Sequence, residues 1–299
     1  MNASVRLLET VIPSSVTVRA EIPAAHASAR ILGTERTGSG TFIDAAGIVL
    51  TVNYIVMGAH TVELTLIDDT TMKANVVAQD FHTGLAVLRV PGDGYPFLRG
   101  PAERQARCGE EVFILASSGG ANRRINAGAI FSLSPFDAYW EYQLDRGILT
   151  TAMNPGFGGG ALINNAGRLV GIVSLDLNDV GRFTLAIPVE HFFEHREELL
   201  RYGRRTTRPR RAWVGLFCYE MHDHVVIAGV LPGAPGEQAG LRAGDVIVGL
   251  NGDKVSERRG FYQTLWAHKP GDVLRFEIFR ESAVTQLSLH AGDAETFFA

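Results

Sequence analysis

The chain has 299 residues, of which 46% are hydrophobic and 20% are charged, and its formal net charge at pH 7 is −4. This composition supplies enough apolar side chains for packed cores and excludes disordered and fibrous classes. The small negative charge gives no footprint for nucleic acid. No run of residues approaches the ~18 consecutive apolar positions that a membrane-spanning helix needs.

The beginning of the chain and its two cysteines bear on the cellular compartment. The first ten residues, "MNASVRLLET", contain no basic segment followed by an apolar run, which is the pattern of a signal peptide. Cys108 and Cys218 lie far apart in the sequence and are interpreted as single thiols, consistent with a reducing compartment. These features predict a cytoplasmic protein.

Residues 15–190 are rich in short runs with β-strand character, such as "SVTVRAEI", "TVELTLID", "EEVFILAS" and "RLVGIVSL". The runs recur at roughly even spacing with Gly and Asp between them, which favours an all-β barrel or sandwich. "DAAGIV" (44–49) and "NNAGRLV" (164–170) each offer a glycine for a positive φ, so both are predicted to be hairpin turns.

The pattern changes after this region. "PVEHFFEHREELLRYG" (188–203) has the spacing of an amphipathic helix that ends at Gly203. The following "RRTTRPRRAW" (204–213) carries five arginines and a proline, which is typical of a solvated connector. A contact with an acidic partner or nucleic acid stays a weaker alternative. We therefore predict a first domain over residues 1–200, a linker over 201–212 and a second domain over 213–299.

The second domain is predicted to contain strands and one clear helix. The segment "SERRGFYQTLWAHK" (256–269) has helical character, with Ser256 as a plausible N-cap residue. Pro270 and Gly271 follow it and are expected to end the helix.

Four segments in the first domain together resemble the HtrA family of trypsin-like serine proteases that carry a PDZ domain. They read "TGSGTFIDAAGIVLTVNYIV" (37–56), "DFHTGLAVLRV" (80–90), "TTAMNPGFGGGALINNAGRLVGIVSL" (150–175) and "FTLAIPVEHF" (183–192). The segments occur in the family's order over nearly the whole domain. The resemblance implies a mostly β protein, with a chymotrypsin-like double β-barrel followed by a PDZ domain.

The catalytic residues of the family are replaced in this chain. Acyl transfer in such a protease needs a serine nucleophile, a histidine base and an aspartate that orients the histidine. Where the family has these residues, this sequence reads "VNYIV", "TGLAVL" and "GFGGG". The histidine, aspartate and serine positions are therefore Tyr54, Gly84 and Gly158. Three unlike replacements predict a natural pseudoprotease without enzymatic activity.

The glycine-rich segment retains the pattern of a nucleophile and oxyanion turn. The resemblance implies that Gly156, Phe157 and Gly158 are the remnant of this loop, and that the amides of Gly156 and Gly158 converge on an anion. Phe157 either fills the neighbouring specificity pocket or packs into a core, and both alternatives stay open. The loop lacks the lysine and Ser/Thr of a phosphate-binding P-loop, so no nucleotide or other cofactor is expected.

Two further clusters carry side chains that can serve in catalysis or metal binding. Asp80 and His82 stand two positions apart, so their side chains share one face of an extended segment, but a surface turn is the favoured interpretation. The segment "MHDH" (221–224) offers two histidines and an aspartate without a third ligand at suitable spacing, so a turn is favoured and no metal is expected.

The second domain carries a segment characteristic of HtrA-type PDZ domains, "GAPGEQAGLRAGDVIVGLNG" (233–252). In the family, the turn that corresponds to "WVGL" binds the terminal carboxylate of a peptide, which adds as a β-strand. The resemblance thus assigns peptide binding to Trp213, Val214, Gly215 and Leu216. Two residues on the expected helix, Phe261 and Leu265, either line the pocket for the last side chain or belong to the core.

These features support three functional hypotheses. The first is an inactive HtrA-like adaptor, regulator or holdase in protein quality control that binds peptides or protein C-termini. The second is a residual or repurposed endopeptidase. The third is a structural subunit, since the resemblance implies a homotrimer or a mixed oligomer with active relatives. The apolar residues Leu7, Leu8, Val11 and Ile12 are candidates for that assembly.

Overall fold

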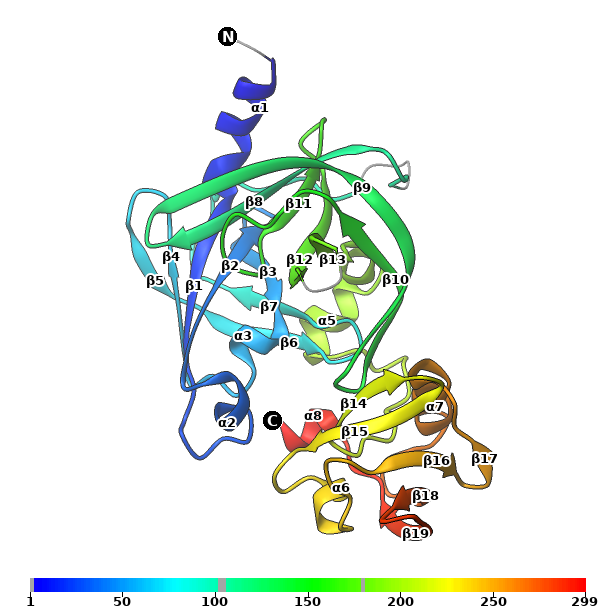
Figure 1. Ribbon diagram of the computed structural model, residues 1–299. Helices are drawn as coiled ribbons and strands as arrows, with labels where there is room; N and C mark the ends of the chain where they lie inside the picture. The colour runs from blue at the N-terminus through cyan, green and yellow to red at the C-terminus, as the bar shows by residue number, and fades with distance from the viewer. Residues whose placement is uncertain (1–2, 102–105, 179–180) are drawn as a thin grey trace. The chain divides into compact units, whose positions relative to one another are not determined.

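The computed structural model describes residues 3–101, 106–178 and 181–299, and it divides the chain into two compact units (Figure 1). The first unit comprises Met1–Pro135 and Leu144–Thr206, and the second comprises Phe136–Gln143 and Thr207–Ala299. The boundary at 206/207 falls inside the predicted linker. The second unit also takes an internal segment from the first predicted domain, which the sequence analysis did not anticipate.

The first unit begins with two helical segments, α1 (Ala3–Val11) and the 3₁₀ helix η1 (Ile12–Ser14). A seven-stranded antiparallel sheet follows, with the strand order β5-β4-β1-β2-β3-β7-β6. Its strands are β1 (Ser15–Glu21), β2 (Glu35–Phe42), β3 (Ile48–Val52), β4 (Thr61–Thr65), β5 (Thr71–Lys73), β6 (Asn75–Asp80) and β7 (Leu85–Arg89). Two one-turn helices, α2 (Ala29–Leu32) and α3 (Asn53–Val56), lie in its connections.

The other half of this region is a closed barrel with the strand order β10-β13-β12-β11-β8-β9. Its strands are β8 (Glu111–Gly119), β9 (Asn122–Ala138), β10 (Tyr142–Thr150), β11 (Ala161–Asn164), β12 (Leu169–Leu177) and β13 (Phe183–Pro188). The predicted mostly β architecture is confirmed. Its core contains wholly buried branched side chains such as Ile114, Leu162 and Val173.

Both predicted hairpin turns are confirmed. Asp44 Oδ1 accepts a hydrogen bond of 3.0 Å from the amide of Ile48, and Gly47 has a φ of +84° between β2 and β3. Gly167 has a φ of +70° between β11 and β12, where Asn164 Oδ1 accepts bonds from two following amides. A side-chain acceptor before a positive-φ glycine is the usual chemistry of such turns.

The predicted helix over 188–203 is interrupted. The structure has α4 (Glu190–Phe193) and α5 (Arg196–Tyr202), with His195 at a φ of −120° as the N-cap of the second helix. Gly203 ends α5 in the left-handed conformation, as predicted. The connector to the second unit is shorter than the predicted 201–212, because α5 runs to Tyr202 and Ala212 is already fully buried.

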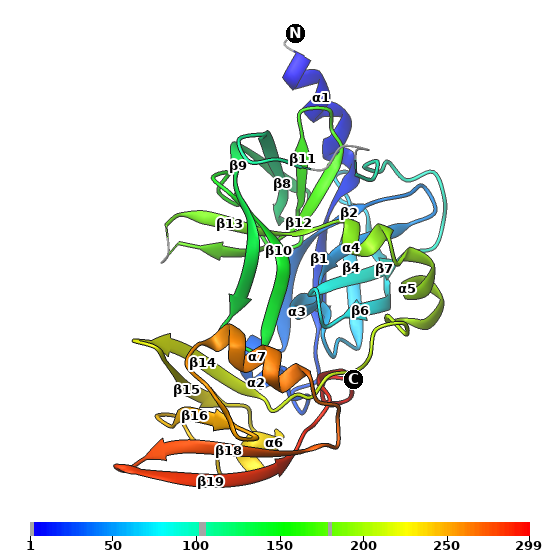
Figure 2. The same cartoon turned by 90° about the vertical axis from the view of Figure 1, so that its right-hand side faces the viewer.

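The second unit is built on a sheet with the order β14-β15-β16-β18-β19, to which β17 adds beside β16 (Figure 2). Its strands are β14 (Leu216–Met221), β15 (His224–Val230), β16 (Val246–Leu250), β17 (Asp253–Lys254), β18 (Val273–Arg280) and β19 (Ala283–His290). Its helices are α6 (Pro235–Gln238), α7 (Arg258–Trp266) and α8 (Ala294–Phe297). Helix α7 begins later than predicted: Glu257, not Ser256, is its N-cap residue, and no side chain caps it.

Candidate active site and carboxylate-binding loop

Tyr54 lies on the short helix α3, directly after β3, and its backbone is held in place by Arg36. The Arg36 guanidinium donates to the carbonyl oxygens of Tyr54 at 2.8 Å and Met57 at 3.1 Å. A cation at the C-terminal end of a helix is favourably placed for these carbonyls. Burial lowers the pKa of Arg36 to about 10, so the side chain still carries its charge at neutral pH. Arg36 therefore fixes the position of Tyr54, the residue predicted to stand at the histidine position of the family.

The Tyr54 hydroxyl occupies the space that a nucleophile side chain would need. It donates a hydrogen bond of 2.7 Å to the carbonyl oxygen of Ser174 on β12. A Cβ atom placed on Gly158 would collide with this hydroxyl. Burial, with a smaller contribution from Asp176, raises the pKa of Tyr54 above its ordinary value, so the phenol stays protonated at neutral pH. Tyr54 thus cannot act as a general base.

Gly84, the residue predicted to stand at the aspartate position of the family, contributes only backbone groups to this region. Its φ is +80°, its amide donates to Asp80 O at 2.7 Å, and its carbonyl accepts from the amide of Asn53 at 2.8 Å. A side chain other than glycine is strained at this φ. The nearby Asp80 and His82 lie at the predicted turn, but the turn is not on the surface, since the two residues are only 5% and 9% exposed. Asp80 Oδ1 instead accepts from the backbone amide of His82 at 2.9 Å.

The glycine loop between β10 and β11 is bonded tightly to its surroundings. The Phe157 amide donates to Ser117 O at 2.8 Å, and the Ser39 amide donates to Gly158 O at 2.7 Å. The expectation of two open amides is wrong for Gly156, whose N–H donates to Asn154 Oδ1 at 3.3 Å. The core alternative for Phe157 is also wrong, because its side chain is 37% exposed.

One serine–histidine pair lies close to this region and was missed by the sequence analysis. His26 Nδ1 and Ser28 Oγ are 2.8 Å apart, the distance expected of a nucleophile and its base. Ser28, however, is completely buried, and its hydroxyl also accepts from Arg36 Nη2 at 2.6 Å and donates to Met57 O at 3.1 Å. A nucleophile must reach its substrate, so the pair supports the chain around α3 and not acyl transfer.

The turn predicted to bind peptide carboxylates, residues 213–216, binds a carboxylate within the second unit. We call this segment the carboxylate loop. The side chain of Glu141 accepts from the amides of Val214 at 3.1 Å, Gly215 at 2.5 Å and Leu216 at 2.8 Å. The Gly215 φ of +82° turns successive N–H groups toward one point, which forms an anion-binding nest. Sequence reasoning missed Glu141, because it lies 73 residues before Val214.

Burial and hydrogen bonding act in opposite directions on Glu141. The residue is 7% exposed, and its burial raises the pKa of the carboxyl group to about 7. The three amides and the nearby Arg211 oppose this shift, since they favour the charged form.

The other residues assigned to peptide binding are buried. Trp213 is 8% exposed, and its ring packs against those of Phe297 at 4.7 Å and Phe298 at 5.7 Å between centroids. Phe261 and Leu265 on α7 are 1% and 0% exposed and belong to the core cluster of the second unit.

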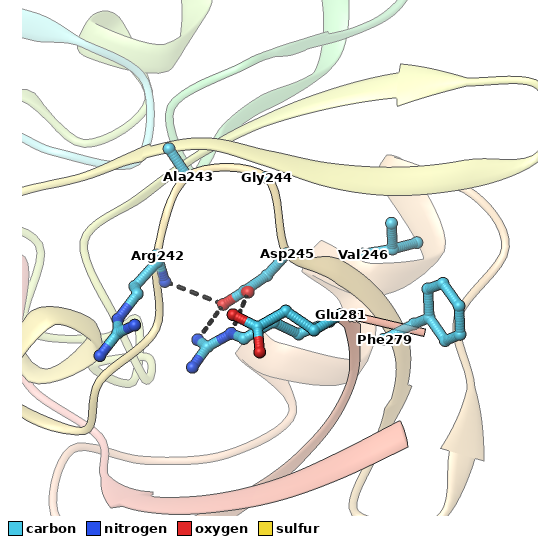
Figure 3. A pocket seen from close by; sticks show the side chains of 8 residues that line it. Arg242, Ala243, Gly244, Asp245, Val246, Phe279 and Glu281 are labelled. Carbon is cyan, nitrogen blue, oxygen red and sulfur yellow. Dashed lines mark hydrogen bonds and ion pairs between the residues drawn. The ribbon is translucent and has the colours of Figure 1, made fainter. Parts of the chain in front are cut away.

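A shallow pocket lies elsewhere on the second unit, around Asp245 (Figure 3). The Asp245 carboxylate accepts from Arg280 Nε at 2.6 Å and from the Arg242 amide at 2.8 Å. Although burial alone would raise it, the hydrogen bond from Arg280 leaves the pKa of Asp245 below its ordinary value. The carboxylate is thus satisfied by hydrogen bonds within the fold.

The "MHDH" segment is the turn between β14 and β15, and His222 and Asp223 both have positive φ. Two successive positive-φ residues are characteristic of a type I′ hairpin turn. Within residues 3–101, 106–178 and 181–299, no group of three metal-ligating side chains is found. No helix in the described ranges is long and apolar enough to cross a membrane.

Comparisons with known proteins agree with this architecture. Residues 38–172 match the trypsin-like peptidase domain family, and residues 208–290 match the PDZ domain family. A probable periplasmic serine endoprotease DegP-like protein of Ectopseudomonas mendocina is 30% identical over 274 residues, covering 85% of this chain and 56% of the relative. A protein of the same name from Pseudomonas savastanoi is 27% identical over 289 residues, covering 90% and 58%. The chain therefore spans somewhat more than half the length of these curated relatives.

Solved structures share the fold at low sequence identity. The HtrA-type protease AlgW with a tripeptide gives a TM-score of 0.59 at 22% identity, covering 97% of both chains. The serine endoprotease from Yersinia pestis gives 0.59 at 21% identity, covering 98% of both. With a trypsin-like peptidase domain followed by a PDZ domain, and with DegP-like relatives along most of its length, the chain belongs to the HtrA family.

Proposed function

We propose that this chain is a catalytically inactive HtrA homologue that binds peptides or protein C-termini through its PDZ domain, as an adaptor, regulator or holdase. The observation that carries the proposal is the position of the Tyr54 hydroxyl, in the space of a Cβ atom at Gly158. The site lacks a nucleophile, and the volume that the nucleophile would need is filled.

The size of the expected loss in kcat supports the absence of proteolysis. Loss of the serine protease triad costs about 10⁶-fold in kcat, and the residual rate depends on a working oxyanion hole. In this chain the Gly156 amide already has an acceptor in Asn154, so one donor of that hole is engaged. In this proposal the contribution of the triad to the rate is therefore lost, and the contribution of the oxyanion hole is reduced.

The peptide-binding part of the proposal rests on the carboxylate loop. Three backbone amides converge on one carboxylate there, and β14 directly follows the loop as an edge strand of its sheet. A peptide that adds to such an edge gains main-chain hydrogen bonds, while the loop recognises its terminal charge.

Binding of a peptide library tests this proposal. Each peptide is offered with a free carboxy-terminus and as the C-terminal amide. We expect binding that is lost on amidation. Binding that is indifferent to the terminus would contradict the proposed role of the carboxylate loop, and would move attention to the glycine loop.

Proteolysis is the alternative function, because the curated relatives are named as endoproteases. A serine-reactive phosphonate probe, read by mass spectrometry, separates the two hypotheses. The proposal predicts no labelled residue, and a single labelled serine would favour a repurposed endopeptidase.

Assembly and compartment are also carried over from the relatives as proposals. We expect a homotrimer or a mixed oligomer with active relatives; Leu7 and Leu8 on α1 are only partly buried, while Val11 is 4% exposed. A monomer in light scattering at micromolar concentration would contradict this. The relatives' names are at odds with the cytoplasmic location expected from the sequence, so we propose a periplasmic location, which cell fractionation tests.

A further inference from the structure

The segment 137–141 of the second unit pairs with β14 and reaches the carboxylate loop. Its Tyr139 carbonyl accepts from the Cys218 amide at 2.6 Å, and Trp140 forms an antiparallel bridge with Phe217. The segment thus adds beside β14 and runs toward the loop that precedes this strand. Glu141, at its end, supplies the carboxylate that the loop binds.

Side chains hold the start of the same segment. Arg258 Nε on α7 donates to Asp137 Oδ2 at 2.7 Å, and Arg259 Nη2 donates to Asp137 Oδ1 at 3.1 Å. Tyr262, one turn further along α7, donates to the Ala138 carbonyl at 2.9 Å. The segment is therefore anchored at both ends, by ion pairs at Asp137 and by backbone amides at Glu141.

Aromatic rings cover the middle of the segment. The Tyr139 ring lies 6.0 Å from Phe217 and 5.6 Å from Tyr219, measured between centroids. Phe217 and Tyr219 are two positions apart on β14 and so share one face of the strand. Tyr139 remains 41% exposed and Tyr219 52% exposed. This partial burial suits a contact that can open.

We propose that segment 137–141 is a built-in ligand of the PDZ domain, which external carboxy-terminal peptides must displace. The inference rests on the proposed peptide-binding function and adds its regulation. The Glu141 side chain and the terminal carboxylate of a peptide compete for the same three amides. Because the internal ligand is always present, the apparent dissociation constant of a peptide is raised by the inverse of the undocked fraction.

Hydrogen exchange of the full chain tests docking directly. The amides of Val214, Gly215 and Leu216 are compared in the native chain, in Glu141→Ala and in Asp145→Ala. Asp145 is an exposed acidic residue on β10 and serves as the matched control. We expect the three amides to exchange at least about tenfold faster in Glu141→Ala only. Equal exchange in all three proteins would overturn the proposal.

Measurement of peptide affinity tests the competition. The peptides have a free carboxy-terminus, and their last three residues are two aromatic residues followed by an acidic one, as in 139–141. We expect Glu141→Ala to bind them at least about tenfold more tightly than Asp145→Ala does. Equal affinities would show that the segment does not compete. If neither variant bound any peptide, the proposed peptide-binding function would fail, and hydrogen exchange alone would decide whether the segment docks.

Discussion

The Tyr54 hydroxyl lies where a Cβ atom of residue 158 would be, so Tyr54 and Gly158 fit together as a pair. The hydroxyl is bonded to Ser174 O at 2.7 Å, which fixes it there. A side chain at position 158 therefore requires Tyr54 to move. Tyr54 and Gly158 are thus linked sterically, and a side chain added at position 158 alone should destabilise the fold.

This coupling predicts the result of a double-mutant cycle. Gly158→Ala should destabilise the native chain by about 1–3 kcal/mol, because the new methyl group overpacks against the hydroxyl. Tyr54→Phe should cost about 1 kcal/mol through the lost hydrogen bond. The double variant should lose less unfolding free energy than the two single variants lose in sum. Once the hydroxyl is gone, the Cζ atom of residue 54 lies 3.3 Å from the added Cβ, so the collision is relieved. Urea unfolding measures all four proteins, and strict additivity would contradict the pairing.

Gly84 should resist substitution because of its backbone. With a φ of +80°, Gly84→Ala is expected to cost about 1–2 kcal/mol of unfolding free energy. Asparagine tolerates this conformation better than alanine, so Gly84→Asn is the matched control and should cost less. Thermal unfolding of both variants shows which substitution costs more stability. Equal losses for both variants would show that the φ angle does not set the cost.

Docking of Glu141 should depend on pH. Because burial raises the pKa of Glu141 to about 7, the docked state binds a proton more tightly than the undocked state does. The stabilisation by docking is then fully present below the ordinary glutamate pKa and is lost as the pH rises through about 7. The loss is at most about 3 kcal/mol.

Peptide affinity should consequently increase between pH 5.5 and pH 8 in the native chain. Arg211, Cys218 and Tyr262 are the other ionisable groups coupled to Glu141. Burial raises the pKa of both Cys218 and Tyr262, and Arg211 stays charged over this range, so none of them titrates there. The pH dependence should therefore disappear in Glu141→Gln. The same slope in both proteins would assign it to another group.

Arg123 should be important for the stability of the first unit. Its guanidinium donates to the carbonyls of Thr65 at 2.8 Å, Ser15 at 2.9 Å and Gly120 at 2.9 Å, which connects β9 to β1 and β4. A lysine cannot reproduce this fork of donors. Arg123→Lys should lower the unfolding free energy by about 1–3 kcal/mol, whereas the exposed neighbour Arg124→Lys should stay within about 0.5 kcal/mol. Equal effects would contradict the role given to these bonds.

The fold was largely predictable from local signals. Short apolar runs with Gly and Asp between them indicate the strands, and Gly47 and Gly167 mark hairpins through turn chemistry that depends only on neighbouring residues. The helix over 188–203 is predicted as continuous because apolar residues at helical spacing lie both before Glu194 and after His195. Its interruption at His195 has no such sequence signal.

The candidate site was predictable only in part. Motif spacing names Tyr54, Gly84, Gly158 and the carboxylate loop as candidates, but it does not predict that the Tyr54 hydroxyl lies in the space of a Cβ atom at Gly158. Glu141 was missed because its partners lie 73 to 75 residues away and a single glutamate in a hairpin carries no local signal. The only sequence clue is "DAYWEY" (137–142), which places aromatic residues beside acidic ones at the end of a hairpin.

The most direct measurement is digestion of unfolded casein by the purified chain, beside an active DegP-like relative at equal concentration. The account predicts a rate indistinguishable from that of buffer, because we propose that the triad is absent and because the Tyr54 hydroxyl would collide with a Cβ atom at residue 158. Digestion at a rate close to that of the relative, persisting through purification and sensitive to the phosphonate probe, would contradict the central claim that this HtrA-family chain is not a protease.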